Sequence, residues 1–118
     1  MKLVFLAGPF RGDGSKEAQT DRIERALTWV RKMIEMEIPF YSPHLLSNET
    51  RKFGAQKQTF TIGVQNTILD RCDVLAVIPG WQDSSGTKDE IKSAKERGIP
   101  VVYLEEEGSI QELQRLTK

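Results

Sequence analysis

One stretch of the sequence decides the fold: Ala76-Val77-Ile78-Pro79-Gly80-Trp81-Gln82-Asp83-Ser84-Ser85-Gly86-Thr87-Lys88-Asp89-Glu90-Ile91. An apolar run of the kind found in buried parallel strands ends at the Pro-Gly pair, and an amphipathic helix follows the Ser-Ser-Gly turn. This layout puts a carboxylate, two hydroxyls and a tryptophan at the carboxyl end of a buried strand. Open parallel sheets bind their ligands at that end, so the stretch is also the first candidate for a functional site.

Strand and helix patterns alternate along the rest of the chain. The predicted strands are Lys2 to Ala7, Ile38 to Ser42, Val74 to Ile78 and Val101 to Leu104. The predicted helices are residues 16–36, 59–71, 87–97 and 109–117, and the polar residues 48–58 are expected to form a loop or a frayed helix. The alternation predicts an α/β protein, a Rossmann-like or flavodoxin-like three-layer sandwich with four parallel strands in the order 2-1-3-4.

Composition narrows the classes of protein. The 118 residues predict a single domain, residues 1–118, and 17 basic residues balance 17 acidic ones, which gives no electrostatic case for nucleic acid. No apolar run approaches the roughly 20 residues that span a membrane. The single cysteine, Cys72, predicts a buried free thiol and a cytoplasmic protein. The chain has one histidine and one cysteine, and they are not spaced as metal ligands usually are. We therefore expect no metal and no other cofactor.

The loop after the first strand is rich in glycine. It reads Gly8-Pro9-Phe10-Arg11-Gly12-Asp13-Gly14-Ser15, so its amides could turn toward an anion and Arg11 could add a charge. The spacing is neither the dinucleotide fingerprint nor a P-loop, and an ordinary strand-to-helix loop is the alternative. The strand order 2-1-3-4 brings this loop and residues 79–87 to one crevice, which indicates a ligand site between the first and third strands.

Ser84-Ser85-Gly86-Thr87 precedes the third main helix of this pattern. Free amides at a helix start, together with hydroxyls, suit a phosphate or a sugar hydroxyl. The alternative is ordinary capping, since Thr87 and Glu90 match a Thr-x-x-Glu capping box that explains both residues without any ligand. The sequence leaves these two interpretations evenly balanced.

An aromatic and a histidine complete the candidate set. Trp81 could stack on a nucleobase, or it could pack on its own loop. His44, in Ser42-Pro43-His44 just past the second strand, could donate a proton near neutral pH, or it could be a hydrogen-bonded structural group.

These motifs, taken together and in order, resemble the nucleoside 2-deoxyribosyltransferase superfamily. The matching segments are Ala-Gly-Pro-Phe-Arg-Gly at 7–12, Ser-Pro-His at 42–44, Leu-Asp-Arg-Cys-Asp at 69–73, Pro-Gly-Trp at 79–81 and Ser-Gly-Thr-x-x-Glu at 85–90. Within the superfamily, the chain resembles the branch of small deoxyribosyltransferase-like proteins. The superfamily includes nucleoside deoxyribosyltransferases and 2'-deoxynucleoside 5'-phosphate N-hydrolases.

The resemblance implies roles for individual residues. Glu90 matches the nucleophile that attacks the anomeric carbon, and Ser84 matches the phosphate-binding serine of the hydrolases. Gly86 and Thr87 would shape that turn. Three residues of the first loop, Gly8, Arg11 and Gly12, match the family's first ligand loop. Because members of the family form oligomers, a homo-oligomer, dimer or higher, is also implied.

Two positions depart from the family pattern. Phe5 stands where a tyrosine usually contacts the nucleophile, and Gln65 stands where an aspartate helps to protonate the leaving base. Glutamine can bind a base edge but cannot act as a general acid, so Tyr41 or His44 is expected to substitute.

The sequence thus predicts cleavage of the N-glycosidic bond of a (deoxy)nucleoside 5'-monophosphate, with Glu90 as nucleophile. Trp81 or Phe10 would flank the base, and preorganised backbone amides together with Arg11 would hold the phosphate. Two alternatives stay open: a non-catalytic module that binds a nucleotide or phosphosugar, and a nucleoside deoxyribosyltransferase.

Overall fold

A four-stranded parallel sheet forms the centre of the protein. The computed structural model describes residues 1–10, 14–54 and 57–118. The strands are β1 (Val4–Ala7), β2 (Phe40–Tyr41), β3 (Val74–Val77) and β4 (Val101–Tyr103), in the order β2-β1-β3-β4 with every pair parallel. The helices are α1 (Lys16–Glu35), α2 (Pro43–Thr50), α3 (Gln58–Asp70), α4 (Ser85–Glu96) and α5 (Ser109–Thr117), with short 3-10 turns η1 (Arg51–Phe53) and η3 (Trp81–Asp83). The predicted α/β class and strand order are confirmed.

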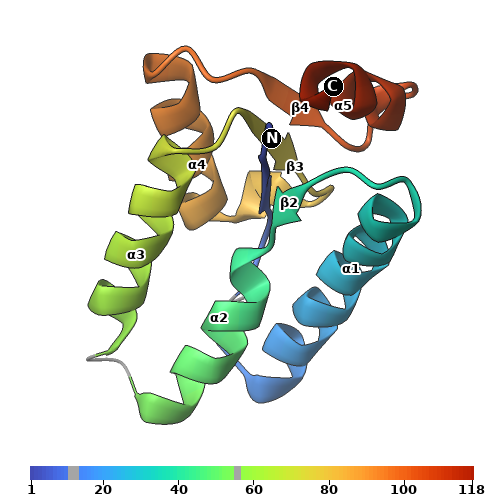
Figure 1. Cartoon of the computed structure of the whole chain (residues 1–118). Helices are drawn as coiled ribbons and strands as arrows, with labels where there is room; N and C mark the ends of the chain where they lie inside the picture. Colours follow the sequence, from blue (N-terminus) through green and yellow to red (C-terminus); the bar gives the residue numbers. More distant parts are fainter. Residues whose placement is uncertain (11–13, 55–56) are drawn as a thin grey trace.

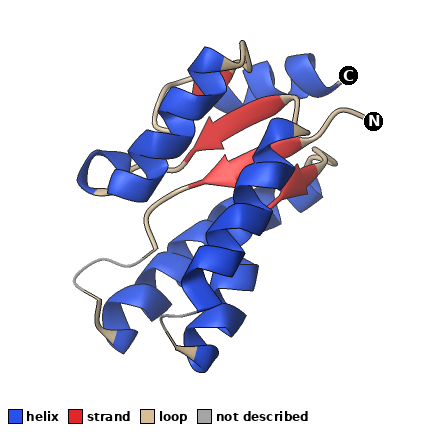
Figure 2. Cartoon of the chain, turned by 90° about the vertical axis from the view of Figure 1, so that its left-hand side faces the viewer, coloured by secondary structure: helices blue, strands red, loops and turns tan. Residues whose placement is uncertain are grey.

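Alternating side chains of the strands build two separate cores. Val4 and Leu6 of β1 point to the face that α1 and α5 cover, whereas Phe5 and Ala7 point to the face that α3 and α4 cover. Figure 1 shows α3 and α4 on one side of the sheet and α1 and α5 on the other, and Figure 2 shows the strands between the two helix layers. All four residues of β1 and all four of β3 are buried, as the apolar runs predicted.

Helix α2 corrects the prediction of loop or frayed helix for residues 48–58. Its eight residues begin at Pro43, which suits the first position of a helix because proline has no N–H to satisfy and its φ is already helical. Helix α2 and the 3-10 turn η1 together extend to Phe53. Residues 48–53 of the predicted loop are therefore helical. The start of α2 at Pro43 ends β2 after Tyr41, and β2 begins only at Phe40, so the predicted strand Ile38 to Ser42 is reduced to two residues.

Smaller corrections concern the ends of elements. β1 begins at Val4 instead of Lys2, and β3 and β4 each end one residue earlier than predicted. Helix α4 begins at Ser85, two residues before the predicted start at Thr87. None of the helices in the described part of the chain combines the length and apolar character needed to cross a bilayer.

Candidate functional site

The loops that follow β1 and β3 meet at the carboxyl edge of the sheet. The backbone N–H of Ile78 donates a hydrogen bond of 2.8 Å to the carbonyl of Ala7. A Cβ at Gly8 would lie 2.8 Å from Cδ1 of Ile78, so the close approach of the two chains requires glycine there. Gly80, with φ of +95°, lies against Pro9, whose Cγ is 3.9 Å from the position of a Cβ. The structure therefore brings the two predicted loops together at the first-third strand junction, as far as the described residues reach.

His44 fixes the start of α2 against the first loop. Its Nε2 donates to the carbonyl of Pro9 over 2.9 Å, and the Phe10 ring meets its ring edge-on at a centroid distance of 6.1 Å. The side chain is buried, and burial lowers the pKa of the imidazole although the hydrogen bond to Pro9 opposes the shift. The neutral ring therefore carries its proton on Nε2 and leaves Nδ1 as an acceptor.

Two buried polar atoms at this point have no hydrogen-bond partner in the described part of the protein: Nδ1 of His44 and Oγ of Ser42. Ser42 directly precedes α2, at the position where a serine usually caps a helix. Its hydroxyl nevertheless accepts no hydrogen bond from a backbone amide. Buried polar atoms need a partner from protein, solvent or ligand. The start of α2 thus holds one acceptor, Nδ1 of His44, and one hydroxyl, that of Ser42, whose hydrogen-bonding capacity the described residues leave unused.

Ser84, not Thr87, is the cap of α4. The Ser84 Oγ accepts a hydrogen bond of 3.2 Å from the Thr87 N–H, and the buried Thr87 hydroxyl donates a second of 2.9 Å to the same oxygen. The predicted Thr87–Glu90 capping box is therefore wrong, because the helix begins earlier and Glu90 lies in its second turn. The N–H groups of Ser85 and Gly86 have no acceptor among the described residues and remain available for an anion.

Glu90 lies on the side of α4 that faces α3. Arg97 is seven residues further along the helix, hence on the same side, and its Nε forms an ion pair of 2.8 Å with Asp70 at the end of α3. The Glu90 side chain is partly buried, and none of the described groups donates a hydrogen bond to it. Burial raises its pKa from 4.5 to about 8, with a further contribution from the Asp89 carboxylate. The carboxyl group is not used for capping and is held in a poorly hydrated place.

Gln65 ties α3 to α2. Its Nε2 donates to the carbonyl of Pro43 and to the Ser47 hydroxyl, each over 3.1 Å. The Gln65 side chain therefore lies beside the first turn of α2, where its acceptor Pro43 directly precedes His44. Sequence reasoning did not identify Ser47 or the unpaired Ser42 hydroxyl, although Ser-Pro was a recognisable helix-start signal.

Tyr41 and Trp81 each make a ring contact with a residue of the sheet. Tyr41 packs on Phe5 with centroids 5.7 Å apart, and burial, then the Cys72 thiol, raises the pKa of its hydroxyl. Trp81 packs on Tyr103 with centroids 5.4 Å apart and donates from Nε1 to Glu105 over 3.2 Å. The packing partner of Trp81 therefore lies on β4 and not on its own loop, as the predicted alternative had it, and the contact anchors η3 to β4.

Arg11 and Gly12 lie outside the described residues. Two surface hollows lie elsewhere, one on the outer side of α1 and one on the outer side of α3, and Glu90 lines neither.

The doubly wound sheet and the edge formed by β1, β3, α2 and α4 define an α/β protein with a candidate ligand site at its topological switch point. Residues 2–104 match the family described as Domain of unknown function (DUF7768), so the chain belongs to that family. None of the curated proteins compared with the chain matches it.

Proposed function

We propose that the protein cleaves the N-glycosidic bond of a (deoxy)nucleoside 5'-monophosphate, with Glu90 as the nucleophile. The carboxyl group of Glu90 carries the proposal, because it is partly buried, is free of capping, and lies in the second turn of α4 on the side that faces α3. A carboxyl group with a strongly shifted pKa in such a place is a candidate catalytic group.

The chemistry follows from this placement. The ionised Glu90 forms an ester bond to C1' while the bond from C1' to the base breaks, and water then displaces the carboxylate at the same carbon. The amides of Ser85 and Gly86 suit the 5'-phosphate.

The leaving base must take up a proton. His44 is poorly suited to give it, since its single proton is held by Pro9. Tyr41 keeps its hydroxyl proton because its pKa is raised, and it is the remaining donor of the predicted catalytic set.

The pKa of Glu90 makes the proposal testable by pH. With a pKa of about 8, roughly one tenth of the groups are ionised at pH 7. A nucleophilic role therefore requires turnover to rise with pH up to about 8, whereas a general-acid role would require it to fall.

The direct test incubates the protein with a panel of deoxynucleoside 5'-monophosphates and measures free base by chromatography. We expect release with the wild type and with Asp89→Asn, a matched change at the adjacent exposed carboxylate, but not with Glu90→Gln. Equal release by all three proteins, or release that falls between pH 6 and 8, would contradict the role of Glu90.

A non-catalytic binding module is the second candidate. It is favoured by Phe5, which packs on Tyr41 and cannot donate a hydrogen bond to a nucleophile. Thermal stabilisation by a nucleotide without release of base would support this candidate. Appearance of a new nucleoside when a second free base is added would indicate a transferase.

A further inference from the structure

We propose that α2 and η1, residues 43–53, form a lid that lifts from α3 and from the carboxyl end of β1. The lid contacts β1, lies between α1 and α3 (Figure 1), and binds the Pro9 carbonyl of the loop after β1 through His44. Because this loop borders the candidate site, lifting the lid opens the site on that side. The effect of the lid on turnover rests on the function proposed above, whereas its motion does not.

The lid takes no part in either apolar core. Among the residues that the structure describes, neither core cluster includes a side chain from α2 or η1. Leu45 is 51 % exposed and Phe53 is 66 % exposed. Burial of apolar surface is the main source of stability in a fold. A segment without it therefore opens more readily than the sheet and the helices that pack on the sheet.

Polar contacts with α3 hold the lid closed instead. Gln65 of α3 donates to the Pro43 carbonyl and to the Ser47 hydroxyl, each over 3.1 Å. The Oγ1 atoms of Thr61, also on α3, and Thr50 form a hydrogen bond of 2.8 Å. Hydrogen bonds to water replace these contacts when the lid lifts, so the net free energy that they contribute to the closed position is small.

The closed position also leaves polar atoms without any partner. Four buried side-chain polar atoms lack a hydrogen bond in the described part of the protein, and three of them lie in the lid or directly before it: Oγ of Ser42, Nδ1 of His44 and Oδ1 of Asn48. Water reaches these atoms when the lid lifts, which stabilises the open position. We therefore expect the two positions to lie close in free energy.

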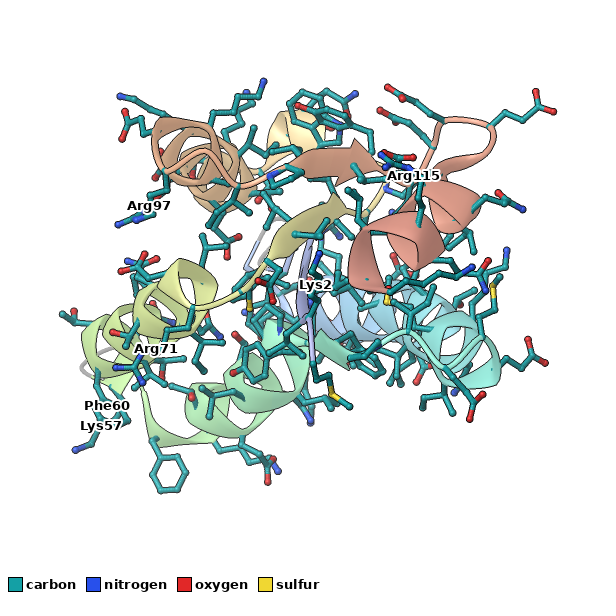
Figure 3. The ribbon with its side chains drawn as sticks, turned by 45° about the horizontal axis from the view of Figure 1, so that its top comes forward. Lys2, Lys57, Phe60, Arg71, Arg97 and Arg115 are labelled. Carbon is teal, nitrogen blue, oxygen red and sulfur yellow. The ribbon has the colours of Figure 1, made fainter. Side chains whose placement is uncertain are left out.

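The neighbouring segments determine which element moves. Helix α3 enters the core at its end through Leu69, so it stays in place when the lid lifts. The start of α3 lies far from the core, since Figure 3 shows Phe60 at the margin of the molecule beside Lys57, directed away from the body. Gly54 follows η1 with φ of +91°, a conformation that glycine adopts readily, and it provides a flexible joint at the end of the lid.

Thiol labelling tests the motion, because Thr61 lies on the anchored helix and contacts the lid, and is only 5 % exposed. The thiol of Thr61→Cys should react with iodoacetamide in buffer much faster than that of the native Cys72 in the core, each relative to its own rate in denaturant. Adding Gln65→Ala should raise the first rate about tenfold and leave the rate of Cys72 unchanged. Adding Asn66→Ala, at the next and exposed position of α3, should change neither rate.

Two results of this labelling would overturn the proposal. One is equal protection of the two thiols, and the other is a parallel rise of both rates with Gln65→Ala. Either result would show that α2 leaves α3 only when the whole protein unfolds.

A disulfide should lock the lid. The short distance between Oγ1 of Thr50 and Oγ1 of Thr61 places the two thiols of Thr50→Cys/Thr61→Cys within reach of each other. Oxidised glutathione accepts the two electrons and two protons that the thiols lose when their sulfur atoms join. A lifted helix of eight residues is too short to stay folded alone, so its amides exchange with solvent. The disulfide should slow hydrogen exchange in α2 at least about tenfold, reversibly and without effect on α4. Unchanged exchange in α2 would contradict the lid.

Release of base separates the lid from the proposed chemistry. The locked protein should release base from a deoxynucleoside 5'-monophosphate more slowly than the reduced protein, and reduction should restore the rate. If labelling and exchange behave as expected but neither the wild type nor any variant releases base, the proposed function fails and the lid is supported. If the locked and reduced proteins release base at the same rate, control of access by the lid is refuted.

Discussion

The Ser84 hydroxyl oxygen receives two hydrogen bonds from one residue, Thr87: one from its backbone N–H at 3.2 Å and one from its hydroxyl at 2.9 Å. This pairing starts α4 two residues earlier than the sequence pattern indicated. It also removes Glu90 from any capping role, which is why that carboxyl group is available for chemistry.

Ser84→Ala should therefore destabilise the fold. It removes the cap and leaves the buried Thr87 hydroxyl without its partner, and the expected loss is about 1–2 kcal/mol in the free energy of unfolding. Urea denaturation measures it. Ser85→Ala, at the next and exposed serine, should change stability by less than about 0.5 kcal/mol. A larger loss in Ser85→Ala than in Ser84→Ala would refute the assignment of the cap.

Gly8→Ala should destabilise the junction of β1 and β3. The new Cβ would lie 2.8 Å from Cδ1 and 2.9 Å from Cβ of Ile78, so a backbone or side chain must move, at a cost of about 1–3 kcal/mol. Gly86→Ala is the control, because a Cβ there meets nothing within 4 Å. Unfolding midpoints in urea should fall only in the first variant, and equal midpoints would contradict the close approach.

Glu90 should make the protein less stable as pH rises. Its pKa is about 8 in the folded state and 4.5 ordinarily, so between these values the folded state binds more protons than the unfolded state. Stability relative to Glu90→Gln should therefore fall from about pH 5 to pH 8 and stay lower above pH 8. Urea titrations of both proteins across this range measure the difference. A difference that does not change with pH would show that the carboxyl group is well hydrated.

The single histidine allows a direct measurement of pKa. Burial lowers the pKa of His44, so its Cε1 proton resonance should titrate below 6.5 in the folded protein and near 6.5 in urea. Because the unfolded chain takes up the proton first, this residue favours folding at neutral pH, and its contribution is lost as pH falls below 6.5. A folded-state midpoint above 6.5 would show that Nδ1 is charged and donates a hydrogen bond.

Cys72 should resist alkylation in the native protein. Burial and the neighbouring Asp73 raise the pKa of its thiol to about 11, so little thiolate is present at pH 8. Iodoacetamide should modify the thiol much faster in denaturant than in buffer, as mass spectrometry can follow. Equal rates in both conditions would place Cys72 at the surface.

The sequence by itself determined the sheet and its order. Continuous apolar runs at the start of the chain and at Val74 to Ile78 predicted buried parallel strands. Because these strands alternate with segments of helical periodicity, few other sheet orders were possible. The meeting of the loops after β1 and β3 followed from that topology, because carboxyl ends of parallel strands share one edge.

Tertiary structure decided which of the possible local interactions form. Ser84 and Thr87 were both acceptable caps for α4, and only the path of the chain from η3 selected Ser84. The Trp81 ring could have bound a ligand or packed against the protein. In the structure it packs on Tyr103 and donates a hydrogen bond to Glu105. The pKa of Glu90 likewise follows from how far the surrounding helices exclude water, and that depends on contacts between residues distant in the sequence. The local sequence pattern determines which residues form helices and strands. Which side chains distant in the sequence pair with one another is determined only when the helix layers pack on the sheet.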